Sequence, residues 1–209
     1  MHQRWYAAGV RTDHELVVAW RAGEGAAGEL LFGRYFQAIS RFFRNKLSQG
    51  VDDLVQQTFV ALLEGRDRLR TETSFRSYLF GIAHNVLRAH VRELARESKF
   101  DPASSSIRAL DPGMSTMRWK SQEQRILLLG LRQIALEHQI VLELVYWEGL
   151  NAAEIAAVIG VPHSTMRSRI QRARKLLETA IHELGQSAQL IESTLDGLER
   201  WAAEIRAAV

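Results

Sequence analysis

A run of positive charge without any acid lies toward the C-terminal end of the sequence. Five cations and no aspartate or glutamate occur between residues 162 and 175, namely Arg167, Arg169, Arg172, Arg174 and Lys175. On a helix Arg172 and Lys175 lie opposite an apolar stripe, where side chains meet base edges in a major groove. The other three arginines lie on the flanks, where they reach phosphates. A solvated surface helix is the commoner origin of a charge run, but the absence of interleaved acids favours DNA. The predicted contact residues are Ser164, Arg167, Ser168, Gln171, Arg172, Arg174 and Lys175.

The elements that must position these side chains are two short helices around a tight turn, within residues 151–175. The first helix has an apolar stripe that includes Ile155 and Ile159, and Gly160 suits the left-handed residue that ends a helix. Pro162 has a backbone angle compatible with the first turn of the second helix. The apolar stripe of that second helix consists of Met166, Ile170, Ala173 and Leu177. Two short helices separated by a tight turn with these residues are typical of a helix-turn-helix motif.

A second basic segment lies in the N-terminal half, where residues 75–96 predict a helix that combines aromatic rings with cations and an amide. Rings stack on unpaired bases and cations follow their phosphates, so the combination suits single-stranded DNA. The competing interpretation places the rings of Phe75, Tyr78 and Phe80 in the core; we expect this for most of them, with one or two rings facing outward. The polar and cationic residues on this helix include Arg76, His84, Asn85, Arg88 and Arg92.

A third candidate surface lies on the helix predicted over residues 51–65. Asp52 and Asp53 occupy its first turn, where carboxylates interact favourably with the helix dipole. Gln56, Gln57 and Val60 join Asp53 on or near an outward face that is polar but weakly charged. Such a face is either solvated or binds protein, and periodicity leaves both interpretations open.

Composition narrows the classes of function. The chain has 209 residues, 46% of them hydrophobic, a net charge of +3 and no cysteine, which excludes disulfides, zinc ribbons and thiol catalysis. Its seven histidines are scattered, and no metal-binding motif or catalytic constellation occurs, so we expect no enzyme, no metal and no cofactor. No apolar run approaches the roughly 20 residues that span a bilayer, and the first residues lack the apolar core of a signal peptide. We therefore expect a cytoplasmic protein that does not bind membranes.

Apolar periodicity predicts an all-α fold of two helical domains. The helices expected in the N-terminal domain, residues 1–96, cover residues 14–23 (with Asp13 as N-cap), 28–47, 51–65 and 75–96. Residues 97–124 contain two of the three prolines and a triple serine, and they predict a flexible linker. The C-terminal domain, residues 125–182, is expected to place two scaffold helices before the helix-turn-helix.

An extension, residues 183–209, follows the predicted helix-turn-helix. Its apolar residues continue a four-three spacing that predicts an amphipathic helical seam, interrupted at Gly185 and Gly197. The seam consists of Leu177, Ile181, Leu184, Ala188, Ile191, Leu195, Leu198, Ala202 and Ile205. Because residues 176–209 hold six acids against two arginines, one interpretation is that the tail regulates access to the basic helix. The other is a passive helix that completes the core of the C-terminal domain.

Three segments in this order resemble a bacterial RNA polymerase sigma factor of the extracytoplasmic function group of the sigma-70 family. DDLVQQTF resembles region 2.2, FRSYLFGIAHN region 2.3 and EIAAVIGVPHSTMRSRIQRARKLL region 4.2. The resemblance implies an alternative sigma factor that binds core RNA polymerase and directs promoter-specific initiation. Region 2 would engage and melt the minus-10 element of promoter DNA, and region 4 would read the minus-35 element. The regulator of such a protein would be an anti-sigma factor or, by the charge argument above, the chain's own C-terminal tail.

The resemblance assigns the candidate residues to three surfaces. Those that would dock on polymerase are Asp52, Asp53, Gln56 and Gln57. Those that would contact the minus-10 element are Tyr78, His84, Asn85, Arg88 and Arg92. The residues of the acid-free helix would contact the minus-35 element.

Two other classes of function stay open. One is a stand-alone helix-turn-helix transcriptional regulator whose N-terminal domain senses a ligand or dimerises. The other is a helical adaptor that uses both domains for protein contacts. The basic aromatic helix and the DDLVQQTF face argue against the regulator, and the acid-free helix argues against the adaptor.

Overall fold

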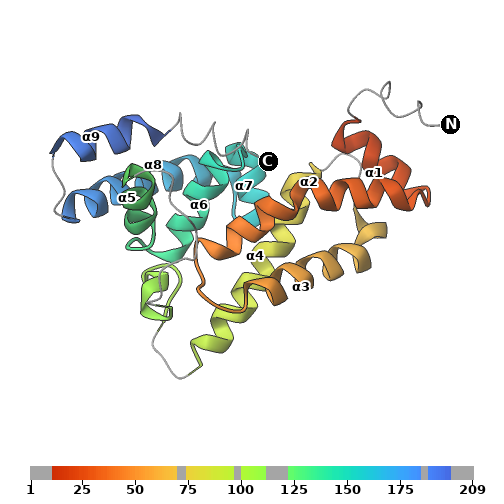
Figure 1. Cartoon of the computed structure of the whole chain (residues 1–209), viewed down its shortest axis with the longest axis horizontal. Coiled ribbons are helices and arrows are strands. Elements are labelled where there is room, and N and C mark those ends of the chain that lie inside the picture. The colour runs from red at the N-terminus through yellow and green to blue at the C-terminus, as the bar shows by residue number, and fades with distance from the viewer. Residues whose placement is uncertain (1–10, 70–73, 97–99, 112–121, 185–187, 199–209) are drawn as a thin grey trace.

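The structure is a computed structural model that describes residues 11–69, 74–96, 100–111, 122–184 and 188–198. Within these ranges the chain forms nine α-helices, two short 3₁₀ helices and no strand, which confirms the predicted all-α fold (Figure 1). The α-helices are α1 (Asp13–Arg21), α2 (Gly25–Arg44), α3 (Val51–Glu64), α4 (Phe75–Leu94), α5 (Gln122–Leu131), α6 (Leu136–Tyr146), α7 (Ala152–Ile159), α8 (His163–Glu183) and α9 (Ala188–Asp196). The 3₁₀ helices are η1 (Arg66–Arg68) and η2 (Ile107–Ala109). In the described ranges no helix is both long and apolar enough to span a membrane.

Helices α1–α4 form what we call the N-terminal module. Its first helix begins one residue earlier than predicted, because Thr12 and not Asp13 is the N-cap. The Thr12 hydroxyl accepts from the Glu15 amide at 3.3 Å while the Glu15 carboxylate accepts from the Thr12 amide at 2.6 Å, a capping box. Asp13 is thereby left free to accept from Arg34 and from the Tyr35 hydroxyl of α2. This contact ties α1 to the next helix.

The core of the N-terminal module is rich in aromatic rings. Phe42 packs edge-on against both Phe43 and Phe80, with ring centroids 5.4 and 5.7 Å apart. Trp20 of α1 lies so close to Gly28 of α2 that a Cβ atom there would stand 2.5 Å from the indole nitrogen. The absence of a side chain at Gly28 therefore permits the close approach of these two helices.

Helices α5–α8 form the C-terminal module, and α9 packs on α5 and α8 (Figure 1). Ile191 and Leu198 are buried against an apolar cluster that includes Leu127 and Leu177. The described part of the extension thus completes the core of this module, as the passive interpretation of the tail expects. The later seam positions, Ala202 and Ile205, lie outside the described residues.

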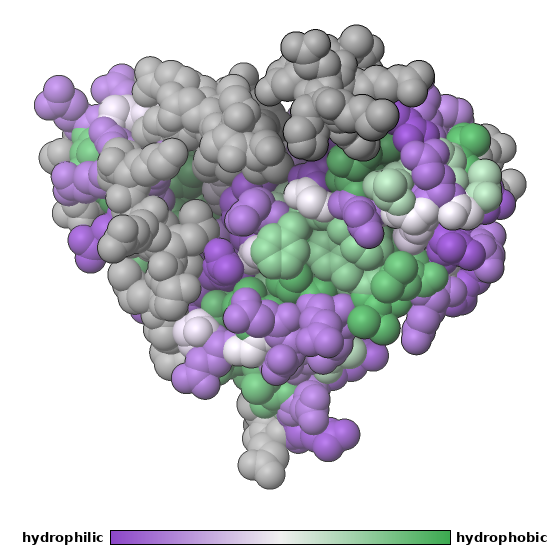
Figure 2. Space-filling view, turned by 45° about the vertical axis from the view of Figure 1, so that its right-hand side comes forward, coloured by the Kyte–Doolittle hydropathy of each residue, from purple (hydrophilic) through white to green (hydrophobic). Residues whose placement is uncertain are grey.

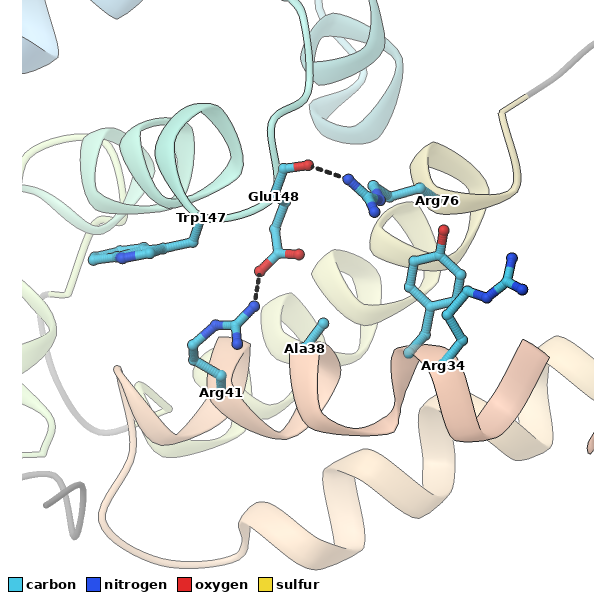
Figure 3. A pocket seen from close by; sticks show the side chains of 7 residues that line it. Arg34, Ala38, Arg41, Arg76, Trp147 and Glu148 are labelled. Carbon is cyan, nitrogen blue, oxygen red and sulfur yellow. Dashed lines mark hydrogen bonds and ion pairs between the residues drawn. The ribbon is translucent and has the colours of Figure 1, made fainter. Parts of the chain in front are cut away.

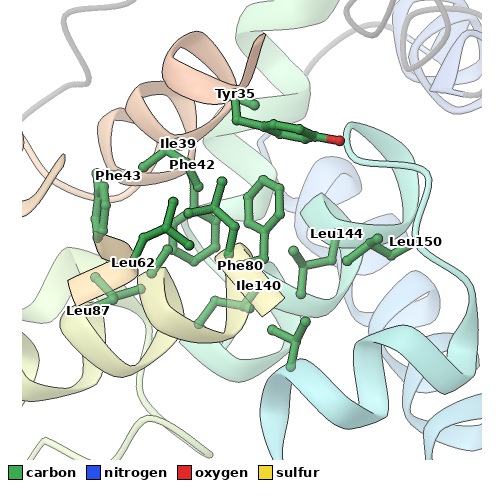
Figure 4. Close-up of a cluster of buried hydrophobic side chains, with 14 of the residues drawn as sticks. Tyr35, Ile39, Phe42, Phe43, Leu62, Phe80, Leu87, Ile140, Leu144 and Leu150 are labelled. Carbon is green, nitrogen blue, oxygen red and sulfur yellow. The ribbon is translucent and has the colours of Figure 1, made fainter. Parts of the chain in front are cut away.

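The two modules share one continuous apolar core. Ile140 and Leu144 of α6 and Leu150 lie beside Phe42 and Phe80 of the N-terminal module (Figure 4). Helix α7 packs along α4. The sequence predicts two domains joined by a linker, but it contains no signal that α6 and α7 would bury apolar side chains against the first domain.

Part of the predicted linker packs against both modules. Residues 100–111 contain Ile107, which is fully buried in the shared core. The Leu136 amide donates to the Ser105 carbonyl at 3.1 Å, and the Ser48 amide donates to the Asp111 carboxylate at 2.6 Å. This segment therefore holds the start of α6 beside the end of α2.

Candidate nucleic-acid interface

Local capping positions the two helices of the helix-turn-helix. The Asn151 side chain accepts from the amides of Ala153 and Glu154 at 2.9 and 3.1 Å, and the Glu154 carboxylate accepts from the Asn151 amide at 2.9 Å. Gly160 ends α7 with φ of 78°, in the left-handed region that the sequence predicted for it. Pro162 is the N-cap of α8, one position before its first helical residue. The turn therefore follows from residues that the sequence makes recognisable.

Helix α8 presents all seven predicted contact residues to solvent. Its buried side carries Met166, Ala173 and Leu177, and Ile170 is half-buried, so the predicted apolar stripe faces the module. The exposed residues on the other side are Ser164, Arg167, Ser168, Gln171, Arg172, Arg174 and Lys175. Among the described residues of the extension, α9 lies on the α5 side of α8 and leaves this face uncovered.

Two flanking arginines of α8 contact the module that carries them. Arg169 lies 3.5 Å from the Glu137 carboxylate, and the Arg174 guanidinium lies over the Tyr146 ring at 5.5 Å. Burial lowers the pKa of His138, and the positive charges of Arg172 and Arg169 lower it further. The positive field of α8 thus extends over the adjoining surface of α6, as expected for a face that binds a polyanion.

On α4 the predicted contact residues divide between surface and interior. Asn85, Arg88 and Arg92 are exposed. Tyr78 is half-buried, and its hydroxyl donates to the Gly65 carbonyl at 3.1 Å. The rings of Phe75 and Phe80 are in the core, so of the three rings only that of Tyr78 reaches the surface in part.

His84 lies inside the contact between α4 and α7, with only 5% of its surface exposed. Burial lowers its pKa to about 4, and the positive charge of Arg88 adds to the effect, while a hydrogen bond to the backbone of Val158 opposes it. The Nδ1 atom is buried and has no hydrogen-bond partner. His84 is therefore neutral at pH 7 and is covered by the C-terminal module.

The polar face predicted on α3 is exposed and borders an apolar surface. All four residues of the set are exposed, namely Asp52, Asp53, Gln56 and Gln57. Val60 and Leu63, further along α3, are 44% and 50% exposed, and Phe36 of α2 stacks on Phe59 with ring centroids 6.2 Å apart. Figure 2, turned to bring the side of α1–α3 forward, shows apolar residues gathered there within a polar border. Such a patch is typical of a protein-binding surface.

Sequence reasoning missed a hollow of about 160 Å³ between the modules (Figure 3). Arg34 and Arg41 of α2, Arg76 of α4, and Trp147 and Glu148 after α6 lie around it. Arg41 forms an ion pair with the Glu148 carboxylate at 2.7 Å, and Arg76 donates to the Glu148 carbonyl at 2.6 Å. Because the partners are 107 and 72 positions apart, no local pattern marks them.

Comparison with known families identifies two segments of the chain. Residues 31–97 match the model of sigma-70 region 2, and residues 124–177 match that of sigma-70 region 4. The chain is 28% identical to the ECF RNA polymerase sigma-E factor of Escherichia coli over 187 residues, which cover 83% of this chain and 96% of that protein. It is 26% identical to the protein of the same name from Haemophilus influenzae over 184 residues, 83% of this chain and 97% of that protein.

Two solved structures share the arrangement of the helices. CnrH, in complex with the cytosolic domain of CnrY, superposes with a TM-score of 0.60 at 25% identity, over 82% of this chain and 97% of that one. The sigma factor RpoE of Bartonella quintana, in complex with the anti-sigma factor NepR, superposes with a TM-score of 0.60 at 19% identity, over 74% of this chain and 96% of that one. The second likeness bears on the fold alone.

Proposed function

The chain belongs to the extracytoplasmic function group of the sigma-70 family, and from this premise we propose that it is an alternative sigma factor that directs core RNA polymerase to specific promoters. The observation that carries the proposal is the presence of regions 2 and 4 in order on one chain, the second with an acid-free recognition face open to solvent. A stand-alone helix-turn-helix regulator has no need of region 2, so that alternative is not favoured.

The exposed face of α8 is the proposed reader of the minus-35 element. Arg172 and Gln171 are exposed, and a guanidinium or an amide can form two hydrogen bonds to a base edge. Arg167 and Arg174 lie on the flanks and would bind phosphates, which position the helix without specifying sequence. Ser164, Ser168 and Lys175 complete the contact surface.

Helix α4 is the proposed contact for the unpaired bases of the minus-10 element. Asn85, Arg88 and Arg92 are available in the present arrangement, because they are exposed. His84 becomes available only when α7 moves away from α4, and Tyr78 only when its bond to Gly65 is broken. This difference in exposure suggests an order of binding. The exposed cations bind phosphates first, and the covered side chains contact the bases afterwards.

The polar face of α3 is the proposed docking surface for core polymerase. Its acids, Asp52 and Asp53, offer charge for specificity and association rate, and the neighbouring apolar residues offer area for affinity. Along α3, Gln56 and Gln57 lie between these acids and the apolar residues. Polymerase-bound sigma factors are initiation factors without catalysis, and we propose the same for this chain, acting in the cytoplasm where polymerase and promoter DNA are found.

An anti-sigma factor is a further proposed partner. The structurally similar RpoE protein is bound to the anti-sigma factor NepR. The same class of partner would fit this chain, with the C-terminal extension as the alternative regulator. Retention of an anti-sigma protein from the same operon or genome on the immobilised chain would support the first of these.

Transcription with purified components tests the proposed function. Core RNA polymerase is incubated with a promoter library, with and without the protein, and initiated transcripts are sequenced. Transcripts that depend on the protein and share two sequence elements are the expected result. Replacing Asp53 with arginine should abolish them, whereas the exposed Glu29→Arg on α2 should not. Transcripts that are identical with and without the protein would refute the proposal.

A further inference from the structure

The last described helix, α9, lies on the C-terminal module as a short amphipathic cover (Figure 1). Ile191, Thr194 and Leu198 are 6%, 0% and 8% exposed, whereas Gln189 and Glu192 are exposed to solvent. Residues three and four positions apart share one side of a helix, so one side of α9 faces the module and the other faces solvent. A single buried stripe therefore joins α9 to the module.

The surface beneath α9 is formed by the C-terminal module itself, and we call it the region 4 groove. A Cβ atom at Gly130 of α5 would stand 2.8 Å from the side chain of Ile181 and 3.2 Å from that of Leu177, both on α8. Helices α5 and α8 thus pack directly on each other, and α9 lies across them. The groove therefore has walls that are held together by contacts independent of α9. The residues that line it around Leu198 are Leu127, Leu131, Leu142, Tyr146, Trp147 and Leu177.

The fit of α9 to the groove is incomplete. A cavity of about 10 Å³, lined almost entirely by apolar side chains, lies beside Leu198. The atoms around such a gap lose part of their dispersion attraction. Thr194 is fully buried, but its hydroxyl donates to the Leu190 carbonyl of α9 itself at 2.6 Å. The stripe thus fills the groove with general apolar contacts, which another amphipathic helix can also form.

Helix α9 depends on the groove for its own stability. It has nine residues, and isolated helices shorter than roughly 12 to 15 residues are marginal in water. A short terminal helix with few buried side chains belongs to the parts of a protein that open locally at low free energy. Only residues 184–187 separate it from the end of α8, so the chain keeps α9 at a high effective concentration near the groove. α9 therefore resembles a tethered ligand more than a wall of the module.

Region 4 of the family includes the walls of the groove but not its cover. The family model matches residues 124–177, which contain Leu127, Leu131, Trp147 and Leu177, and it ends before α9. The matched sigma-E factors align over 96% and 97% of their own length but over 83% of this chain. Without α9, this apolar groove would be open to solvent, and exposed apolar surfaces of this kind are typical of protein-binding sites.

The position of the groove is compatible with DNA binding. α9 packs on the α5 side of α8, whereas the seven predicted minus-35 contacts are exposed on the opposite side. A partner in the groove and a duplex on α8 can therefore bind at the same time. Core RNA polymerase is the partner in the proposed function that must hold region 4 while α8 reads DNA. A helix laid in an apolar groove is a recurring mode of protein recognition.

We propose that the region 4 groove binds an amphipathic helix of core RNA polymerase, and that α9 occupies it in the free chain as an exchangeable internal ligand. Displacement of α9 then accompanies the binding of polymerase to region 4. The identity of the partner rests on the proposed function. The exchange of α9 is a property of the free chain.

A peptide with the sequence of residues 186–209 tests the exchange. The peptide carries a fluorescent label, and its anisotropy is measured against the full-length chain. Ile191→Asp in the chain places a charge in the stripe and should release the internal α9. If α9 covers the groove in about nine-tenths of the parent molecules, this release should tighten peptide binding about tenfold. Glu192→Ala, on the exposed side of the same helix, should match the parent, and a peptide that carries I191D should bind neither chain.

Binding to immobilised core RNA polymerase tests the partner. The Ile191→Asp chain should bind polymerase more tightly than the parent and the Glu192→Ala chain, because polymerase no longer has to displace α9. An excess of the unlabelled peptide should reverse this gain, because the peptide refills the groove. Circular dichroism checks that the helices other than α9 are kept. If Ile191→Asp loses them, Leu198→Ala, which removes apolar contacts without adding a charge, takes its place and should shift both measurements in the same direction.

A peptide that fails to bind the released chain would overturn the exchange. Peptide binding that tightens while the affinity for polymerase stays equal in parent and released chain would overturn the assignment of the groove to polymerase. The peptide measurement needs neither polymerase nor promoter. A chain that passes it but binds no polymerase in any form would refute the proposed function and keep the exchange of α9.

Discussion

Acidification should weaken the fold through His84. Its pKa is lowered to about 4 in the folded chain, first by burial and then by the charge of Arg88, from 6.5 in a free histidine. The unfolded chain therefore takes up the proton at a higher pH than the folded chain does. Stability from this group is intact well above pH 6.5, falls as the pH decreases through 6.5, and stops falling below about pH 4.

The size of the effect follows from the two pKa values. One unit of pKa difference corresponds to about 1.4 kcal/mol, and between pH 7 and pH 5 the unfolded histidine is largely protonated while the folded one is not. The free energy of unfolding should therefore fall by about 2 kcal/mol over this interval because of His84 alone. Since His84 lies between α4 and α7, the same protonation should favour separation of the modules.

Urea denaturation of the parent chain and of His84→Gln at pH 7 and pH 5 measures this contribution. Carboxylates and the other histidines titrate in both proteins, so the difference between their pH dependences isolates His84. The variant should lose about 2 kcal/mol less than the parent between the two pH values. His163→Gln, at an exposed histidine of α8, is the control and should behave like the parent. Equal losses in the parent and in His84→Gln would refute the argument that His84 is buried and neutral.

Four further substitutions test other parts of the structure. Arg172→Ala should weaken binding to a selected minus-35 duplex by about 1 to 3 kcal/mol and relax the sequence preference of the protein. Arg174→Ala should weaken binding to selected and random duplexes alike. Fluorescence anisotropy measures both affinities, and equal losses for both variants on both duplexes would contradict these roles. Ile191→Ala should lower the free energy of unfolding by about 2 to 3 kcal/mol in thermal denaturation and leave duplex affinity unchanged if α9 only completes the core. Gly160→Ala should cost about 1 to 2 kcal/mol from its left-handed backbone alone, because a Cβ atom there meets nothing within 4 Å; a much larger loss would indicate a clash.

The helix-turn-helix was predictable because its determinants are local. Capping by Gly160, the fixed backbone angle of Pro162 and the spacing of Met166, Ala173 and Leu177 all act within a few residues. The exposure of the basic face of α8 then follows, because a helix that buries one stripe must turn the opposite side to solvent. The same reasoning holds for Asp53 and Gln57 on α3.

The environment of His84 could not be predicted in the same way. Along α4 it is one polar residue among several, close to Asn85 and Arg88, and the helical period leaves its side of the helix open to DNA. The structure buries it because α7, which begins 68 positions later in the chain, packs on that side. The helix that covers His84 belongs to the other module, so no sequence pattern within α4 predicts the burial of His84.

The sequence therefore predicted the helices and the seven side chains that α8 exposes, but not the packing of residues 100–111. What required the folded chain was the relation between the modules. Lys46 and Glu143 are 97 positions apart, and each alone resembles an ordinary surface charge. Their burial as a pair depends on how α2 packs against α6. That packing is determined by many weak contacts distributed over both modules, and no periodic pattern in the sequence marks such contacts.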